Sequence, residues 1–258
     1  MNNSEKRKEY IRNIYSKIWS RTRKEYGVGQ YDKDLIRELS KKVKNGIILE
    51  VGIGDGFPYS NVLDEMGYEV YGIDISPTHV DKVKESLPNI NVEVGDSEDL
   101  EFTDNFFDVV FCFRSTWYFP DVIKSIREML RVVKVGGLIM FDLQNSNNLI
   151  HKEGHRKRIE GKRNNLVFNL FKIIKNIIKI IIKPIKSYDV DWLFRRSPII
   201  FETPTDPNNV NRYLKSRDDV KYRLYGVRWD HSSTLEETKK TTDLDQFDRL
   251  VYKVSKEG

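Results

Sequence analysis

The sequence has 258 residues but only one cysteine, Cys112, which excludes an internal disulfide bond and a metal site built from several cysteines. It also contains no internal repeat. Its first twenty residues are too polar for a secretory signal peptide, so the protein is expected in the cytoplasm. These absences argue against a disulfide-stabilised secreted protein and against a repeat array.

The sequence does contain enough apolar material for a folded core, together with one strongly basic segment. Hydrophobic residues make up 39% of the chain and charged residues 32%, with 13 tyrosines and 13 phenylalanines, which excludes global disorder. The formal net charge is +5, yet residues 151–196 alone hold 13 Lys or Arg against four acids. This placement suggests that the basic segment meets an anionic partner, such as phospholipid headgroups, a phosphorylated substrate or nucleic acid, of which nucleic acid is the least expected.

Short apolar runs alternate with helical stretches from residue 47 onward, which is typical of βαβ units around a parallel sheet. Five runs are predicted to be strands: Ile47–Val51, Glu69–Ile73, Ile90–Val94, Phe107–Phe113 and Leu138–Leu143. Two further strands are expected near 221–227 and 247–254, after a short helix near 208–216. The pattern predicts an α/β fold with a doubly wound, mostly parallel, seven-stranded sheet.

The same patterns divide the chain into four segments. Residues 1–45 are predicted to form an N-terminal helical cap, because apolar residues recur there at helical spacing between charged ones. Residues 46–148 hold the five parallel strands. The alternation is then lost for about fifty residues, longer than an ordinary connection, so 149–198 is predicted to be an insertion after the fifth strand. Residues 199–258 are expected to complete the same domain as 46–148.

A glycine-rich loop, Gly52-Ile53-Gly54-Asp55-Gly56, follows the first predicted strand and leads into a helix. Glycines there let the backbone turn tightly and let a ligand approach main-chain N–H groups at a helix N-terminus. No Lys-Ser/Thr pair follows, so the loop is not a phosphate-binding P-loop, and Phe57 replaces the third glycine of the dinucleotide fingerprint. Alone, the loop fits a tight turn without a ligand equally well.

Polar residues at the ends of the next two strands favour a ligand-binding loop over a tight turn without a ligand. Asp74 ends the second strand about twenty residues after the loop, where a carboxylate can accept hydrogen bonds from two ribose hydroxyls. Asp96 and Ser97 follow the third strand, in a position to bind an exocyclic amine and a ring nitrogen of a base. The sequence therefore predicts a nucleoside-containing cofactor.

Five segments occur in a fixed order across roughly residues 46–143: Ile48–Gly56, Gly72–Ser76, Gly95–Leu100, Phe107–Val110 and Leu130–Gly137. Together they resemble the successive motifs of class I S-adenosylmethionine-dependent methyltransferases, although Val135 stands where that family usually has proline. The resemblance implies a Rossmann-like methyltransferase sheet, S-adenosylmethionine as cofactor, and residues 46–148 as the cofactor-binding core. Carried over position by position, it implies these cofactor-binding residues: Glu50, Gly52, Gly54, Gly56, Asp74, Ile75, Asp96, Ser97, Phe113 and Arg114.

The methyl acceptor is constrained mainly by exclusion. Transfer from a sulfonium depends on a nucleophile held in line, so a general base is optional, and neither a catalytic residue nor a metal site is assigned. No Asp/Asn-Pro-Pro-Tyr follows the fourth strand, which disfavours nucleobase and amide nitrogens and leaves an oxygen or nitrogen of a small-molecule, glycan or lipid-linked acceptor. Tyr118, His155 and His231 are the candidates for acceptor-side chemistry; each is explained as well or better as a packing or surface residue.

The insertion contains one ordered pattern, a cationic stripe on a predicted helix over 168–183. The stripe consists of Lys172, Lys175, Asn176, Lys179 and Lys183, and apart from Asn169 the rest of the circumference is Phe, Leu and Ile. A lysine about every turn argues against a membrane-spanning helix. The helix is expected either to lie in the membrane interface, at the inner face of the membrane, or to serve as a lid or dimer contact. The oligomeric state is left open.

The sequence thus predicts an S-adenosylmethionine-dependent methyltransferase, with two alternatives. A nicotinamide-dependent Rossmann oxidoreductase or epimerase would share the glycine loop and Asp74, but the third glycine and a suitably placed Tyr-x-x-x-Lys are missing. A non-catalytic S-adenosylmethionine-binding protein would carry the same motifs as the enzyme, and no residue of the sequence separates the two.

Overall fold

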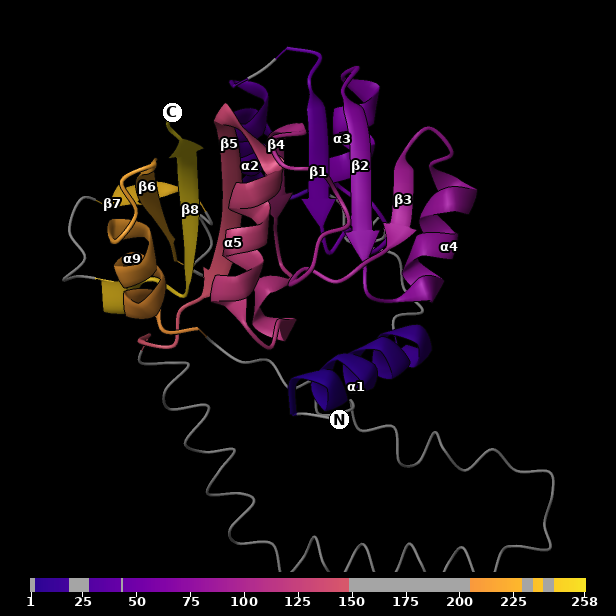
Figure 1. Ribbon diagram of the computed structural model, residues 1–258, viewed down its shortest axis with the longest axis horizontal. Coiled ribbons are helices and arrows are strands. Elements are labelled where there is room, and N and C mark those ends of the chain that lie inside the picture. The colour runs from indigo at the N-terminus through magenta and orange to yellow at the C-terminus, as the bar shows by residue number, and fades with distance from the viewer. Residues whose placement is uncertain (1–2, 19–27, 43, 149–204, 229–233, 239–243) are drawn as a thin grey trace, which may run out of the picture. The chain divides into compact units, whose positions relative to one another are not determined.

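The computed structural model describes residues 3–18, 28–42, 44–148, 205–228, 234–238 and 244–258 (Figure 1). The predicted helix over 168–183 and the candidates His155 and His231 lie outside these residues. Within the described part of the chain, no helix is long and apolar enough to cross a membrane.

The described strands form one eight-stranded sheet in the order β3-β2-β1-β4-β5-β8-β6-β7. Five strands are parallel: β1 (Ile47–Val51), β2 (Glu69–Asp74), β3 (Asn91–Val94), β4 (Phe107–Cys112) and β5 (Val133–Gln144). Three more add in antiparallel fashion: β6 (Val220–Val227), β7 (Glu236–Thr238) and β8 (Arg249–Lys256). The prediction of a mostly parallel sheet that continues into the C-terminal strands is confirmed.

Two details of the predicted sheet are wrong. The count is eight strands rather than seven, because β7 consists of Glu-Glu-Thr and pairs only with β6, so no apolar pattern marks it. In addition, β5 begins at Val133 instead of Leu138. Residues 134–137, which lie before the predicted strand, form an irregularity within β5, where Gly136 has a φ of +76° and the register with β4 shifts.

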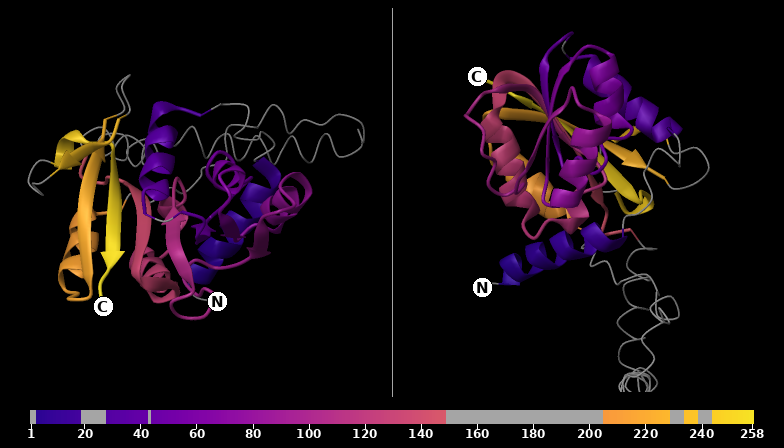
Figure 2. Two further views of the ribbon diagram at one scale, coloured as in Figure 1. Left: turned by 90° about the horizontal axis from the view of Figure 1, so that it is seen from above. Right: turned by 90° about the vertical axis from the view of Figure 1, so that its right-hand side faces the viewer.

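Helices cover both faces of the sheet (Figures 1 and 2). The described α-helices are α1 (Asn3–Ile18), α2 (Gln30–Ser40), α3 (Tyr59–Glu65), α4 (Pro77–Ser86), α5 (Val122–Val132) and α9 (Pro207–Lys215). Successive strand residues point to opposite faces. Ile48 accordingly belongs to a core with residues of α2, α3 and α4, and Leu49 to a core with residues of α5 and α9. The predicted doubly wound arrangement follows from this alternation.

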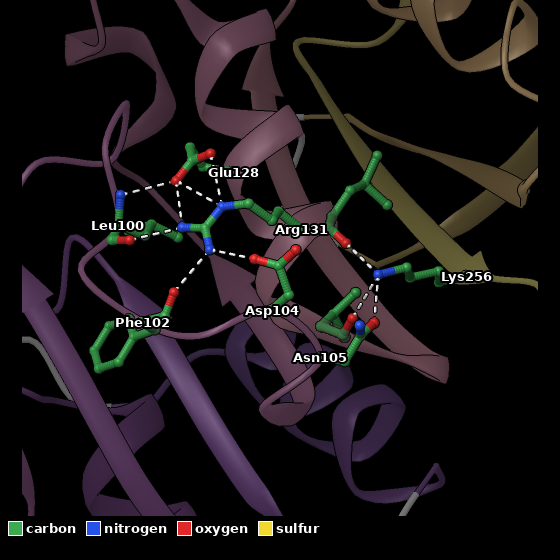
Figure 3. Close-up of polar contacts among 9 residues, drawn as sticks. Leu100, Phe102, Asp104, Asn105, Glu128, Arg131 and Lys256 are labelled. Atoms are coloured by element: carbon green, nitrogen blue, oxygen red, sulfur yellow. Dashed lines mark hydrogen bonds and ion pairs between the residues drawn. The ribbon is translucent and has the colours of Figure 1, made fainter.

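Arg131, in the last turn of α5, fastens the connection between β3 and β4 to that helix (Figure 3). Its guanidinium donates to the backbone carbonyls of Leu100 and Phe102, both at 2.7 Å. It also donates to the carboxylates of Glu128 and Asp104, at 2.7 and 2.8 Å. Glu128 in turn accepts from the backbone N–H of Leu100 at 3.0 Å. The network satisfies polar groups of a connection that has no helix or strand of its own.

Replacing Arg131 by Met is expected to lower the free energy of unfolding by about 2 kcal/mol at pH 7, because Glu128 and two carbonyls lose a charged donor. Hydrogen bonds from Arg131 lower the pKa of Glu128. This stabilisation is therefore complete above the unfolded-state pKa of about 4.3 and is lost as the pH falls through the lower folded-state value. Urea unfolding at pH 7 and pH 3 should show the difference between wild type and variant shrinking at pH 3. A difference independent of pH would contradict the assignment.

Candidate cofactor site

A cavity of about 430 Å³ lies at the carboxyl ends of the parallel strands β1 to β4. This edge is where ligands bind in open α/β sheets. The cavity is lined by nine of the residues predicted to bind the cofactor, namely Glu50, Gly52, Gly54, Asp74, Ile75, Asp96, Ser97, Phe113 and Arg114. Gly56 does not line it. A Cβ at Gly56 would come within 2.6 Å of Leu87 at the end of α4, so the structure gives this glycine a packing role.

The glycine loop is shaped by contacts that leave its backbone facing the cavity. Gly52 has a φ of +78°, and a Cβ there would lie 2.7 Å from the Ser115 side chain, so only glycine fits without displacing the loop after β4. The backbone N–H groups of Gly52 and Ile53 donate to the Ile73 carbonyl at 2.8 and 2.9 Å. Beside Gly54, by contrast, a Cβ would meet no atom within 4 Å, which leaves room for a ligand against the main chain.

Asp74 is held in place by the backbone on both sides of it. One carboxylate oxygen accepts from Gly54 N–H at 2.9 Å and the other from Ser76 N–H at 2.8 Å. The buried His79, from α4, places Nδ1 3.4 Å from the second oxygen. A carboxylate oxygen has two acceptor sites, so Asp74 keeps capacity for hydroxyl donors in the cavity. Its fixed orientation is the kind that a binding residue requires.

Asp96 and Ser97 are anchored differently from each other. Asp96 accepts from Glu98 N–H at 2.9 Å through one oxygen and from the Lys8 ammonium at 2.6 Å through the other. The Ser97 hydroxyl is buried and bonds to the Ser125 hydroxyl at 2.9 Å, on α5. Both residues line the cavity, and the side chain of Ser97 also ties this loop to α5.

The loop after β4 is built around a buried carboxylate, Asp142 of β5. Asp142 is fully buried and accepts from Arg114 N–H at 2.7 Å, from the Tyr31 hydroxyl at 2.9 Å and from Arg249 at 3.1 Å. Arg114 has a φ of +60°, which is uncommon for a residue with a side chain, and its hydrogen bond to Asp142 helps to hold that conformation.

The guanidinium of Arg114 reaches the cavity wall from this fixed backbone. It donates to Asp32 at 2.8 Å and lies 5.3 Å from the centre of the Tyr31 ring, both on α2. Arg249 lies on the other side of this cluster, 5.5 Å from the Tyr31 ring and 4.8 Å from the Trp117 ring. Two cations, two carboxylates and two aromatic rings thus form one connected cluster. Of its members, Arg114, Trp117 and Arg249 line the cavity.

The remaining predicted residues fall into two groups. Tyr118 lines the cavity, in a short 3₁₀ helix over Thr116–Tyr118, while His155 and His231 lie outside the described residues. Cys112 is fully buried, and burial raises the pKa of its thiol well above the ordinary value, which suits a packing role rather than that of a nucleophile. Among the described residues no three His, Cys, Asp or Glu side chains are grouped to hold a metal ion.

Three charged or polar residues of the cavity wall were missed by sequence reasoning: Lys8, His79 and Arg249. Lys8 lies among many charged residues of an amphipathic helix, so nothing local distinguishes it. Arg249 begins β8, far from the glycine loop in the sequence. His79 had a signal, because it follows Asp74 by five residues on the helix that starts at the same edge of the sheet.

The profile of the methyltransferase domain family matches residues 49–141, the segment that supplies most of this wall. Residues 49–141 are therefore a class I S-adenosylmethionine-dependent methyltransferase domain. S-Adenosylmethionine is the cofactor of this domain.

Curated relatives resemble the methyltransferase domain rather than the whole chain. The 2-methyl-6-phytyl-1,4-hydroquinone methyltransferase of Synechocystis is 35% identical over 96 residues, which are 36% of this chain and 30% of that protein. The chloroplastic tocopherol O-methyltransferase of Arabidopsis thaliana is 31% identical over 40% of this chain and 31% of its own length. The matches thus span only about a third of the length of these relatives.

Solved structures resemble nearly the whole chain, at low identity. A protein from Thermotoga maritima described as an S-adenosylmethionine-dependent methyltransferase, possible histamine N-methyltransferase, has a TM-score of 0.61 at 12% identity over 96% of this chain and 100% of its own. An S-adenosylmethionine-dependent methyltransferase from Aquifex aeolicus has a TM-score of 0.52 at 15% identity over 98% of this chain and 99% of its own. These likenesses show that the methyltransferase fold extends beyond the matched domain.

Proposed function

We propose that this protein transfers the methyl group of S-adenosylmethionine to an oxygen or nitrogen of a small-molecule, glycan or lipid-linked acceptor. One observation carries the proposal: the glycine loop, Asp74 and Asp96, which follow three different strands, all line one cavity. A turn without a ligand would not require the carboxylates to converge on the loop. The family membership of residues 49–141 supports the same reading.

The residues that line the cavity suit the separate parts of the cofactor. We assign the ribose hydroxyls to the Asp74 carboxylate, the adenine amine to Asp96, and the methionine part to the backbone of the glycine loop. Ile75 would contact the adenine face, and Arg114 the methionine carboxylate. Bound S-adenosylmethionine supplies an electrophilic methyl group on a sulfonium. The protein's own task is then to hold an acceptor in line with it and to exclude water.

The acceptor side of the cavity is aromatic. Trp117, Tyr118 and Phe119 line it in the loop after β4, which favours an acceptor with an apolar or ring-bearing part. The hydroquinone and tocopherol methyltransferases among the relatives are named for acceptors of that kind. Positioning supplies most of the rate, so Tyr118 is a candidate for orienting the acceptor rather than a required base.

Thermal unfolding with added cofactors is the first test. S-Adenosylmethionine and S-adenosylhomocysteine are expected to raise the melting temperature, and nicotinamide nucleotides to leave it unchanged. Transfer of a labelled methyl group is then measured with separate pools of small phenols and amines, glycans, and lipid vesicles. Stabilisation by nicotinamide nucleotides alone would overturn the proposal. Stabilisation by S-adenosylmethionine without transfer to any pool would favour a non-catalytic binding protein instead.

We extend the proposal to a peripheral membrane contact through residues 168–183, on the sequence pattern alone. The lysine stripe beside a broad apolar face suits the interface of an anionic bilayer. Cosedimentation with anionic vesicles, weakened by salt and absent with neutral vesicles, is the expected result. No binding to anionic vesicles would leave the lid or dimer contact as the explanation of this helix.

A further inference from the structure

Helix α1 reaches three loops at the cofactor edge of the sheet with three basic side chains. Arg7 donates to the Trp117 carbonyl at 3.2 Å, in the loop after β4, and Arg12 donates to the Ile75 carbonyl at 3.2 Å, after β2. Between them, Lys8 contacts the loop after β3. Figure 1 shows α1 lying across the carboxyl ends of these strands. The helix belongs to none of the motifs and lies outside the domain matched at 49–141.

The Lys8 contact differs from the other two because it is buried and doubly paired. Its ammonium lies 2.6 Å from the Asp96 carboxylate and 2.9 Å from the Glu98 carboxylate, and its side chain is only 7% exposed. Burial alone would lower the pKa of Lys8, but the two carboxylates outweigh it and raise that pKa, so the ammonium is charged at neutral pH. Burying a charged lysine costs free energy unless carboxylates pair with it, so this arrangement depends on both partners.

Lys8 and Asp96 also line the same cavity. Asp96 is fixed by two bonds, one from the Glu98 backbone and one from Lys8. Without the ammonium, the Asp96 carboxylate would lose one of these bonds and would face the nearby negative charge of Glu98 with less compensation. Lys124, whose Nζ lies 4.0 Å from Glu98, is half exposed and does not replace it.

We propose that Lys8 is a positioning residue of the cofactor site, which holds the Asp96 carboxylate toward the cavity and thereby couples the docking of α1 to recognition of the adenine end. The inference rests on the proposed function, since it takes the adenosyl group as the ligand of this cavity. It assigns a residue from outside the matched domain to cofactor binding.

A double-mutant cycle tests the coupling, with S-adenosylhomocysteine as the probe and calorimetric affinity as the readout. Lys8→Met is expected to weaken binding about tenfold in the wild-type background and less than about twofold in the Asp96→Asn background, because its effect passes through the Asp96 charge. Lys6→Met, which removes an exposed lysine of the same helix, is the matched control. It is expected to leave the affinity for S-adenosylhomocysteine unchanged in both backgrounds.

Arg12→Met separates this role from simple docking of the helix. It weakens the hold of α1 on the loop after β2 without touching Asp96, so its effect should be equal in both backgrounds. If Lys8→Met also acts equally in both backgrounds, Lys8 merely docks the helix and the inference is wrong. If the wild-type protein does not bind S-adenosylhomocysteine, the proposed function itself fails, which is a different outcome.

The variants are expected to remain folded, since neither described hydrophobic core contains a residue of α1. Thermal unfolding of each variant checks this.

Lys8→Arg is a second test of the positioning role, because a guanidinium can bridge both carboxylates. We expect it to bind within about threefold of wild type. Folded Lys8→Arg that binds as weakly as Lys8→Met would count against the positioning role.

Discussion

Replacing Asp142 by Ala is expected to lower the free energy of unfolding by about 3 to 5 kcal/mol, the usual cost of leaving one member of a buried ion pair without its partner. Asp142 is fully buried, and its carboxylate receives hydrogen bonds from Arg114 N–H, Tyr31 and Arg249. The substitution removes the carboxylate partner of the Arg249 guanidinium, whose side chain is only 11% exposed. It also removes the acceptor that helps to hold Arg114 in its left-handed backbone conformation.

Urea unfolding measures this loss, and two further variants define its cause. Lys221→Met removes an ion pair with Glu257 in which the lysine side chain is 80% exposed, and should change the unfolding free energy by less than about 0.5 kcal/mol. The double variant Asp142→Ala with Arg249→Met should recover part of the loss, because no unpaired charge remains buried. A loss of under about 1 kcal/mol for Asp142→Ala would contradict the central role given to this carboxylate.

Replacing Asp74 by Ala is expected to weaken S-adenosylmethionine binding by at least about a hundredfold. Under the proposed function, the carboxylate accepts two charge-assisted hydrogen bonds from the ribose, each worth about 1.5 to 3 kcal/mol. The backbone contacts to Gly54 and Ser76 would be lost as well, so the loop would be less well ordered for binding.

Calorimetric titration of Asp74→Ala with S-adenosylmethionine measures this effect. Asp81→Ala is the matched control, since Asp81 lies on α4 near the same loop but is exposed to solvent. It should bind as the wild-type protein does. A thermal unfolding curve confirms that the Asp74 variant is folded before its affinity is interpreted. A change in affinity of less than about threefold would remove Asp74 from the site.

The site residues that could be predicted from the sequence are those that a local strand pattern identifies. The glycine loop follows β1, Asp74 ends β2 and Asp96 lies two residues after β3, so one strand pattern predicts both the strand and the residue at its end. The parallel order of the strands then brings these ends to one edge. No separate information about tertiary contacts was needed for them.

The parts that were missed depend on contacts between distant segments. Asp142 lies within an apolar strand pattern, and its partner Arg249 follows it by 107 residues. Lys8 bonds to Asp96 across 88 residues, and an exposed lysine on the same helix has the same local sequence character. The three residues of β7 carry no apolar pattern, because an edge strand needs only backbone pairing. Residue pattern alone does not encode these pairings.

The position of β8 imposes an order on assembly during synthesis. In the sheet, β8 stands between β5 and β6, yet along the chain it is made after both. While the ribosome is still adding residues 220–248, the edge of β5 that later pairs with β8 has no partner. For the same reason, β6 is not yet joined to the parallel strands. The growing chain therefore exposes an unpaired strand edge, a surface prone to aggregation, until residues 249–256 have emerged.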